Sequence, residues 1–272
     1  MKKIRIFLKS IIPPIINNYI KKLGLGIVRF EGDYKSWIDA SERCEGYDSE
    51  EIATKALNAS LLVKSGDFAA ERDTVLFSEI QYSWPVTAAL LLSAAKNGGM
   101  LSVIDIGGAF GSSYFQNIKF LSPLESVSWS IIEQETFVSL AERRAFKIKN
   151  VNFYDNLDTC LLETRPKIAL LSSVLQYIPE PYHMLEILAK GNVDMIVIDR
   201  TPFSVNNRKK LKVQNVSKSI YKGSYPCWFF DARELEELMN RLGYLLLEKF
   251  ESVDNLSHEA VWQGIIFTRV AK

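Results

Sequence analysis

The sequence is poor in the residues that build disulfide frameworks and metal sites. Its 272 residues include three cysteines, Cys44, Cys160 and Cys227, which are odd in number and far apart. This usage argues against a disulfide framework and is typical of a reducing compartment. His183 and His258 are the two histidines, and no cysteine pair has CxxC spacing, so the sequence has neither an HExxH helix nor a Cys/His zinc motif. We expect no metal.

The sequence also lacks a long apolar run. Spanning a bilayer takes about 20 consecutive apolar residues, and no stretch approaches that length. The basic and apolar segment 1–28 is interrupted by Lys9 and by Pro13–Pro14, and no small-residue cleavage site follows it, so it lacks the pattern of a signal peptide. Two interpretations stay open: a basic, amphipathic anchor on an anionic membrane surface, or a terminal helix that packs on the domain. We expect a cytoplasmic protein, either free or peripheral at the inner membrane surface.

Acidic residues are missing from two stretches. The net charge is +1, but residues 1–30 and 200–230 each carry seven bases and no acid. Because the overall charge is near neutral, we expect no nucleic-acid partner. The second stretch is a basic insertion that follows a predicted strand, and we expect its Lys209, Lys210 and Lys212 to hold an anionic acceptor. The alternative is a solvated loop that only balances the acidic remainder.

Short apolar runs that alternate with helical segments predict the fold. Alternation of this kind is typical of a parallel sheet with crossover helices. The five runs are 101–106, 128–132, 151–154, 167–172 and 193–198. Two last runs, 244–250 and 261–269, have no helix between them and should pair antiparallel. The pattern predicts an α/β, Rossmann-like fold with a mostly parallel seven-stranded sheet and a terminal antiparallel pair.

Helix signals dominate the chain before this pattern begins. They include a predicted helical stretch at 70–83 and a helix that starts at Pro85. We therefore divide the chain into a basic amphipathic segment, a helical N-terminal extension, and a Rossmann-like domain with the basic insertion at about 200–230. The boundaries of these three parts are 1–30, 31–98 and 99–272.

A glycine-rich turn follows the first strand of the predicted sheet. Gly107, Gly108 and Gly111 let a ligand approach the backbone closely and leave helix N–H groups facing it. The dinucleotide fingerprint G-x-G-x-x-G does not fit, because Ala109 and Ser112 stand at its second and third glycines.

The pattern for S-adenosylmethionine (SAM) fits better. An acid two residues before the first glycine, followed by glycines at alternate positions, matches Asp105, Gly107 and Gly111, with Ala109 in place of the middle glycine. SAM has no phosphate to neutralise, and its amino group favours a nearby acid. Glu133 ends the second strand, where a carboxylate can accept from both ribose hydroxyls. These residues indicate a SAM site; the alternative is a glycine turn that only packs helix on strand.

Six segments of the sequence carry a family resemblance. They are 31–37 (EGDYKSW), 71–85 (ERDTVLFSEIQYSWP), 105–117 (DIGGAFGSSYFQN), 171–178 (LSSVLQYI), 198–204 (IDRTPFS) and 224–229 (SYPCWF). Over roughly residues 30–270 the chain resembles a family of bacterial SAM-dependent methyltransferases, members of which often occur among genes for surface-polysaccharide biosynthesis. The resemblance implies the Rossmann-like methyltransferase fold and SAM as the cofactor.

The resemblance also implies where SAM binds. The glycines would line its methionine end, and Asp155, after the third strand, would accept from the adenine amino group. Ser172 and Ser173 end the fourth strand, where the chain passes close to the sulfonium in related enzymes. The candidate cofactor-binding residues are Asp105, Gly107, Gly108, Gly111, Glu133, Asp155, Ser172 and Ser173.

Candidate acceptor-binding residues combine hydrogen-bonding groups with aromatic faces that suit sugar rings, although plain core packing is an alternative for the aromatic ones. They are Gln81, Tyr82, Trp84, Tyr177, Arg200 and Tyr225. An oxygen nucleophile also needs a base, and ligands of open α/β sheets bind beyond the carboxyl ends of the strands. Asp199 directly follows the fifth strand and is the candidate catalytic base; a salt bridge with Arg200 or a helix cap is the alternative.

The residues favour one function over its alternatives. The leading interpretation is O-methylation of a sugar or glycan precursor. The alternative is a non-catalytic Rossmann-like binding module in a glycan-assembly complex, which the replaced middle glycine and the lack of an obvious base suggest. An NAD(P)-dependent oxidoreductase is disfavoured by the glycine spacing. The expected partner is a small-molecule or glycan acceptor, with membrane-surface contact through residues 1–28 if that segment is an anchor.

Overall fold

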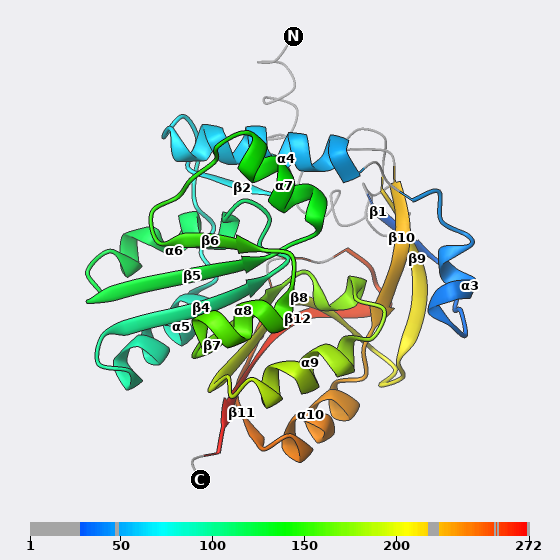
Figure 1. Ribbon diagram of the computed structural model, residues 1–272. Helices are drawn as coiled ribbons and strands as arrows, with labels where there is room; N and C mark the ends of the chain where they lie inside the picture. The colour runs from blue at the N-terminus through cyan, green and yellow to red at the C-terminus, as the bar shows by residue number, and fades with distance from the viewer. Residues whose placement is uncertain (1–27, 47–48, 217–222, 253, 255, 271–272) are drawn as a thin grey trace, which may run out of the picture.

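A seven-stranded sheet forms the centre of the computed structural model, which describes residues 28–46, 49–216, 223–252, 254 and 256–270 (Figure 1). The strand order is β11-β12-β8-β7-β4-β5-β6. Neighbours from β6 to β8 pair in parallel, and β12 pairs antiparallel with both β8 and β11. The bounds are Met100–Ile106 (β4), Ser126–Ile132 (β5), Val151–Tyr154 (β6), Ile168–Ser172 (β7), Met195–Ser204 (β8), Tyr244–Glu251 (β11) and Ala260–Arg269 (β12). The predicted seven-stranded sheet, its terminal antiparallel pair and the Rossmann-like fold are confirmed.

The strand order places a crevice at the carboxyl ends of β4 and β7. From β4 the chain moves outward to β5 and β6, and it then returns across the sheet to β7 and β8 on the other side. The crossovers therefore diverge between β4 and β7. Ligands of open α/β sheets bind at such a point, beyond the carboxyl ends of the strands.

Helices cover both faces of the sheet. In Figure 1, α8 (Leu157–Thr164) and α9 (Pro181–Lys190) lie in front of it, and α5 (Trp84–Lys96) lies behind. The side chains of β4 alternate between the two faces: Val103 packs in the same cluster as α5 and α6 (Ser112–Leu121), whereas Ile104 packs with α8, α9 and α10 (Ala232–Arg241). Both faces of the strand are buried, as its nearly continuous apolar sequence requires.

An apolar cluster holds the N-terminal helix α4 (Ser49–Lys64) against α7 (Glu135–Arg143), which it crosses at the top of Figure 1. Phe110, in the glycine turn, is at the centre of this cluster. Its ring stacks on that of Phe137, with centroids 5.3 Å apart, and meets Phe146 edge-on. The turn is thereby fixed to both helices.

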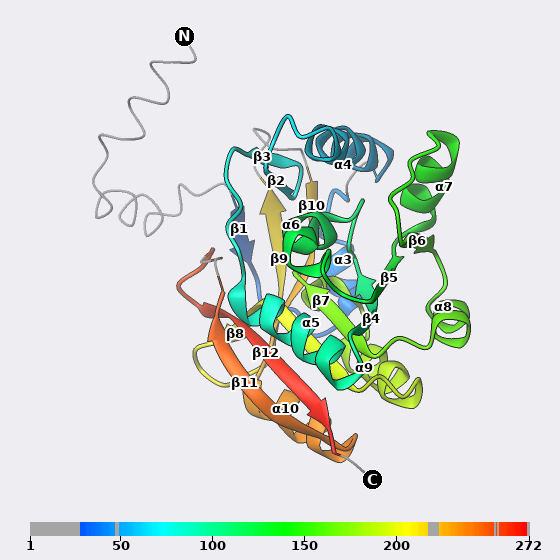
Figure 2. The same ribbon diagram turned by 90° about the vertical axis from the view of Figure 1, so that its left-hand side faces the viewer.

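Residues 70–83 are not a helix, and that prediction is wrong. They contain the hairpin of β2 (Ala70–Arg72) and β3 (Val75–Phe77), seen beneath α4 in Figure 2. Asp73 and Thr74 form its turn with φ of 50° and 69°, a left-handed conformation that ends any helix. The extension is therefore mixed rather than helical. It also contains α3 (Trp37–Ser41) and part of β1 (Val28–Glu31).

The basic insertion is built into a second sheet. Its strands β9 (Lys210–Val216) and β10 (Gly223–Phe229) pair antiparallel, and β9 also pairs with β1. Lys210 and Lys212 both bond to Glu259, at 3.3 and 2.6 Å, and the Lys209 ammonium lies 4.1 Å from the ring centre of Tyr182. The three lysines that we expected to bind an anionic acceptor thus contact Glu259 or Tyr182 of the protein itself, which argues against that role.

No helix among the described residues is long and apolar enough to cross a membrane. The expected anchor at residues 1–28 lies outside the described residues, apart from Val28.

Replacing Phe110 should destabilise the protein. Phe110→Ala removes a fully buried ring that contacts three other aromatic rings, so the free energy of unfolding should fall by about 3–5 kcal/mol. Denaturant unfolding measures this loss. Leu162→Ala, at a side chain 78% exposed, is the control and should leave stability nearly unchanged. A loss below about 1 kcal/mol at Phe110 would mean that α4 and α7 do not depend on this cluster.

Candidate functional site

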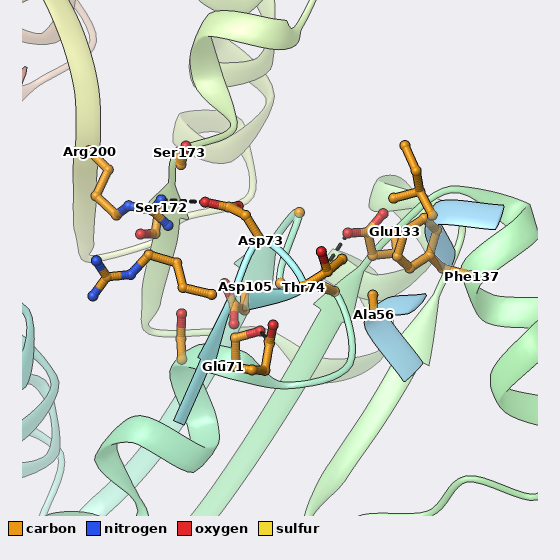
Figure 3. Close-up of a pocket in the computed structure, with 17 residues that line it drawn as sticks. Ala56, Glu71, Asp73, Thr74, Asp105, Glu133, Phe137, Ser172, Ser173 and Arg200 are labelled. Carbon is orange, nitrogen blue, oxygen red and sulfur yellow. Dashed lines mark hydrogen bonds and ion pairs between the residues drawn. The ribbon is translucent and has the colours of Figure 1, made fainter. Parts of the chain in front are cut away.

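A cavity opens at the carboxyl ends of the strands, where the sheet topology places it (Figure 3). With the open solvent at its mouth it spans about 810 Å³, and a compartment that spans about 380 Å³ in the same sense adjoins it. The larger cavity is lined by Ile52, Ala56, Glu71, Arg72, Asp73, Thr74, Asp105, Gly107, Gly108, Ala109, Ser112, Ser113, Glu133, Phe137, Ser172, Ser173 and Arg200.

The glycine turn forms one wall of the cavity. Gly107 has a φ of 68°, and a Cβ there would lie 2.6 Å from a methyl carbon of Val174. A Cβ on Gly108 would lie 2.6 Å from the carboxyl carbon of Asp105. Both positions therefore exclude larger residues. Ala109 adopts the left-handed conformation, with a φ of 47°, so the turn keeps its shape although a side chain replaces the middle glycine.

Asp105 is buried at the end of β4. Its carboxylate accepts a hydrogen bond from the indole Nε1 of Trp129 at 3.0 Å. Burial is the main cause that raises the pKa of this carboxyl to about 7; the indole bond opposes the rise and the nearby Glu133 adds to it. The group therefore titrates near neutral pH.

Glu133 follows β5 and faces the turn. Its Oε1 accepts from the N–H of Ala109 and its Oε2 from the N–H of Gln134, each at 3.0 Å. A carboxylate offers about four acceptor sites, so each oxygen keeps one for a ligand. Two neighbouring acceptors at this spacing suit a pair of adjacent hydroxyls. Burial raises the pKa of Glu133, and the two backbone bonds oppose that rise.

An apolar wall lies beside Glu133. Ile52 and Ala56 of α4 and Phe137 of α7 line this end of the cavity, and Figure 3 shows Phe137 and Ala56 next to the carboxylate. A flat aromatic group attached to the hydroxyl-bearing ring would find apolar contacts here.

Arg200 closes the opposite end of the cavity. Its Nη2 donates to Asp73 in the hairpin turn at 2.7 Å, and its Nε donates to Asp254 at 2.6 Å (Figure 3 shows the first pair). Burial alone would lower the pKa of this guanidinium, but the two carboxylates outweigh it and raise the pKa. The hairpin is thereby tied to the middle of β8.

Asp199, the candidate base, lines the adjoining compartment. It does not follow the fifth strand as expected, because β8 continues to Ser204; Asp199 is instead the last residue of β8 that pairs with β7. It is 4% exposed, and its Oδ1 accepts from the N–H of Arg200 at 2.8 Å. Burial raises the pKa of this carboxyl to about 6, although the N–H bond and the Arg200 charge act in the other direction. Glu71, also in this compartment, accepts from the hydroxyl of Ser112 at the start of α6.

The structure brings most of the predicted site residues together. Asp105, Gly107, Gly108, Glu133, Ser172 and Ser173 line the larger cavity, and Gln81, Asp199 and Arg200 line the smaller compartment. Gly111 is the N-cap of α6 and is not among the lining residues, and neither is Asp155, which follows β6.

The predicted aromatic residues lie outside both spaces. Tyr82 and Trp84 stack on each other with centroids 4.7 Å apart, and Trp84 is 58% exposed. The Tyr177 hydroxyl donates to Gln214 at 3.0 Å, and its ring meets that of Tyr225 at right angles. Tyr177 and Tyr225 are thus structural contacts between η1 (Leu175–Tyr177) and the second sheet.

The hairpin is the part of the site that sequence reasoning missed. Arg72, Asp73 and Thr74 line the cavity from the hairpin and its turn. Because a helix was expected over 70–83, these three residues were not predicted to belong to the site. The apolar wall from α4 was missed as well.

Within the described residues, no group of three or more His, Cys, Asp and Glu side chains could hold a metal ion.

The similarity of this chain to known proteins lies in structure and not in sequence. No protein-family model matches the chain, and no curated protein matches it. The N-terminal domain of EvdMO1, solved in the presence of S-adenosylhomocysteine (SAH) and D-fucose, is similar with a TM-score of 0.49 and 16% identity, over 84% of this chain and 98% of that one. Magnesium protoporphyrin IX methyltransferase from Synechocystis PCC 6803, solved with SAH, has a TM-score of 0.45 and 10% identity, over 68% and 83%.

The buried Asp105 should make stability depend on pH. The pKa of this carboxyl is 3.8 when water surrounds it, as in an unfolded chain, and about 7 in the folded protein. Between these values the unfolded chain has lost a proton that the native state keeps, so stability should fall as pH rises from about 4 to 7, by on the order of 1 kcal/mol per pH unit, and then level off. Asp105→Asn retains an oxygen for the Trp129 bond and should flatten this part of the profile. Denaturant unfolding at several pH values tests this, and parallel profiles for the two proteins would contradict it.

Proposed function

We propose that the protein is a SAM-dependent methyltransferase that methylates a hydroxyl of a sugar or glycan precursor. The observation that carries the proposal is the Glu133 carboxylate. It keeps two free acceptor positions beside a glycine turn and an apolar wall, an arrangement that suits the ribose and adenine of a nucleoside.

The charges of the cavity favour SAM over a dinucleotide. Four carboxylates line the larger cavity, against the two guanidiniums of Arg72 and Arg200. A pyrophosphate would bind at the N–H groups that start α6, where the Glu71 carboxylate of β2 bonds to Ser112 and would repel the two phosphates. SAM instead bears a sulfonium, an ammonium and a single carboxylate, and Asp105 and Glu71 are placed to attract its two cations.

The residues present therefore fit SAM, with Glu133 at the ribose, the α4–α7 wall at the adenine, and Asp105 and the glycine turn at the methionine end. When bound, SAM supplies a methyl group activated by its sulfonium. The protein's own part is to align an acceptor oxygen with that methyl and to exclude water. Asp199, as a carboxylate, accepts the proton that the acceptor hydroxyl loses.

The adjoining compartment supports a polyhydroxylated acceptor because all its lining residues are polar. They are Glu71, Arg72, Gln81, Ser83, Ser112, Ser113, Gln116, Ser172, Asp199 and Arg200. One helical turn beyond Gln116, the ring of Phe120 meets Tyr82 and Trp84 edge-on, at 5.2 and 5.5 Å. An exposed aromatic platform beside a polar compartment suits a sugar, whose ring offers both hydroxyls and apolar C–H faces.

Loss of the Glu133 carboxylate should weaken cofactor binding. A carboxylate that accepts from two hydroxyls contributes about 1.5–3 kcal/mol, which corresponds to a tenfold to hundredfold loss of SAM or SAH affinity in Glu133→Ala. Calorimetric titration measures it. Glu135→Ala, at an exposed glutamate two residues away, is the matched control and should bind normally. If wild-type protein binds neither SAM nor SAH, or if Glu133→Ala binds as wild type does, the proposed site is wrong.

Loss of the Asp199 carboxylate should affect turnover instead. Asp199→Asn should lower kcat by about 100- to 10,000-fold with unchanged SAH affinity, because general-base catalysis contributes that much. Wild-type kcat should rise as pH passes about 6, where Asp199 ionises. The assay is SAH release with a panel of monosaccharides and nucleotide sugars. Cofactor binding without turnover of any sugar would favour the non-catalytic binding module, and full activity in Asp199→Asn would remove it as the base.

A further inference from the structure

Arg72 has an unusual position in the site. It ends β2 and lines both the larger cavity and the adjoining compartment. Among the described residues its guanidinium has no hydrogen bond and no ion pair; its close contact is with the ring of Phe77, 5.6 Å away. Arginine carries five N–H donors, and partly buried donors without acceptors are costly.

The other charged groups around it all have partners. Arg200 is bound to Asp73 and Asp254, as described above. Glu71 accepts from Ser112 and Asp199 from the N–H of Arg200. Among the described residues that line this compartment, Arg72 is therefore the charged side chain that remains available to bind a ligand.

The electrostatic surroundings favour an anion at this guanidinium. Burial lowers the pKa of Arg72, and the positive charge of Arg200 lowers it further, while Asp254, Asp73 and Asp199 act in the opposite direction. Two of these three carboxylates are already occupied by Arg200. A ligand oxyanion would supply the missing acceptors and reduce the repulsion between the two arginines.

We propose, on the basis of the function proposed above, that Arg72 binds a carboxylate or phosphate on the acceptor, so that the substrate is an acidic or phosphorylated sugar. The planar fork of a guanidinium binds either group through two parallel hydrogen bonds. With its anion held at Arg72, the sugar occupies the compartment that Asp199 also lines, and a hydroxyl of the same ring faces the base. Arg72 is thus a specificity-determining residue.

The test compares glucuronate, glucose 1-phosphate and glucose as probes of the full-length protein, with and without saturating SAH. Calorimetry or ligand-observed NMR should show at least tenfold tighter binding of one or both anions than of glucose. The tighter anion identifies carboxylate or phosphate as the recognised group. Arg72→Gln should abolish the preference, and Arg72→Lys should retain part of it because the charge remains. Arg208→Gln, at an exposed arginine paired with Asp33, is the control and should keep the preference.

The outcomes separate this inference from the proposed function. SAH binding by Arg72→Gln shows that the variant is folded and that the cofactor site is intact. Equal affinity for glucose and both anions, no binding of either anion at millimolar concentration, or an unchanged preference in Arg72→Gln would each overturn the role of Arg72. An Arg72-dependent anion preference in a protein that does not bind SAH would keep the anion site and remove methyl transfer.

Discussion

The pairing of Arg200 with Asp73 and Asp254 is the interaction on which the rest of the site depends. The three residues come from the middle of β8, from the β2–β3 turn and from the loop before β12, and their side chains meet at 2.6 and 2.7 Å. Arg200 and Asp254 are only 13% and 15% exposed, so a charge left there without its partner would be strongly destabilising, by roughly 3–5 kcal/mol. Asp73 is 65% exposed, so its contact with the guanidinium positions the hairpin but contributes less. The hairpin then covers the cavity, and Glu71 and Arg72 reach the two spaces beneath it.

Burial gives the carboxylates of the site different tasks. Asp105 lies near the end of β4, and Asp199 is the last residue of β8 that pairs with β7; burial raises the pKa of both, to about 7 and about 6. Asp105 faces the glycine turn, where a ligand cation would favour its ionised form, whereas Asp199 faces the polar compartment, where a raised pKa suits a proton acceptor near neutral pH. Glu133 is bonded to two backbone N–H groups and remains a hydrogen-bond acceptor. In the proposed mechanism one kind of side chain thus serves cation binding, proton transfer and hydroxyl binding, according to its neighbours.

The parts that could be predicted from sequence are those that depend on local pattern. The strands follow from apolar runs, and the glycine turn and Glu133 follow from their positions at the ends of strands. The hairpin could not be predicted in this way, because its Glu71 carboxylate bonds to Ser112 of α6, 41 residues away in the chain. The same is true of the basic insertion, whose Lys212 bonds to Glu259, 47 residues away. A count of charges shows the excess of basic residues, but it does not show which carboxylate or aromatic ring each lysine contacts in the fold.

The position of β12 in the sheet has a consequence for synthesis. This strand follows every other strand of the sheet in the chain, yet it lies between β8 and β11 rather than at an edge. While the chain emerges from the ribosome, one edge of β8 therefore stays unpaired until β12 has been made. Arg200 likewise lacks its partner Asp254, which is made shortly before β12. An exposed strand edge is a template for aggregation in a nascent chain. Completion of the sheet and closure of the cavity thus coincide late in synthesis, and a chain truncated before residue 254 would lose both together.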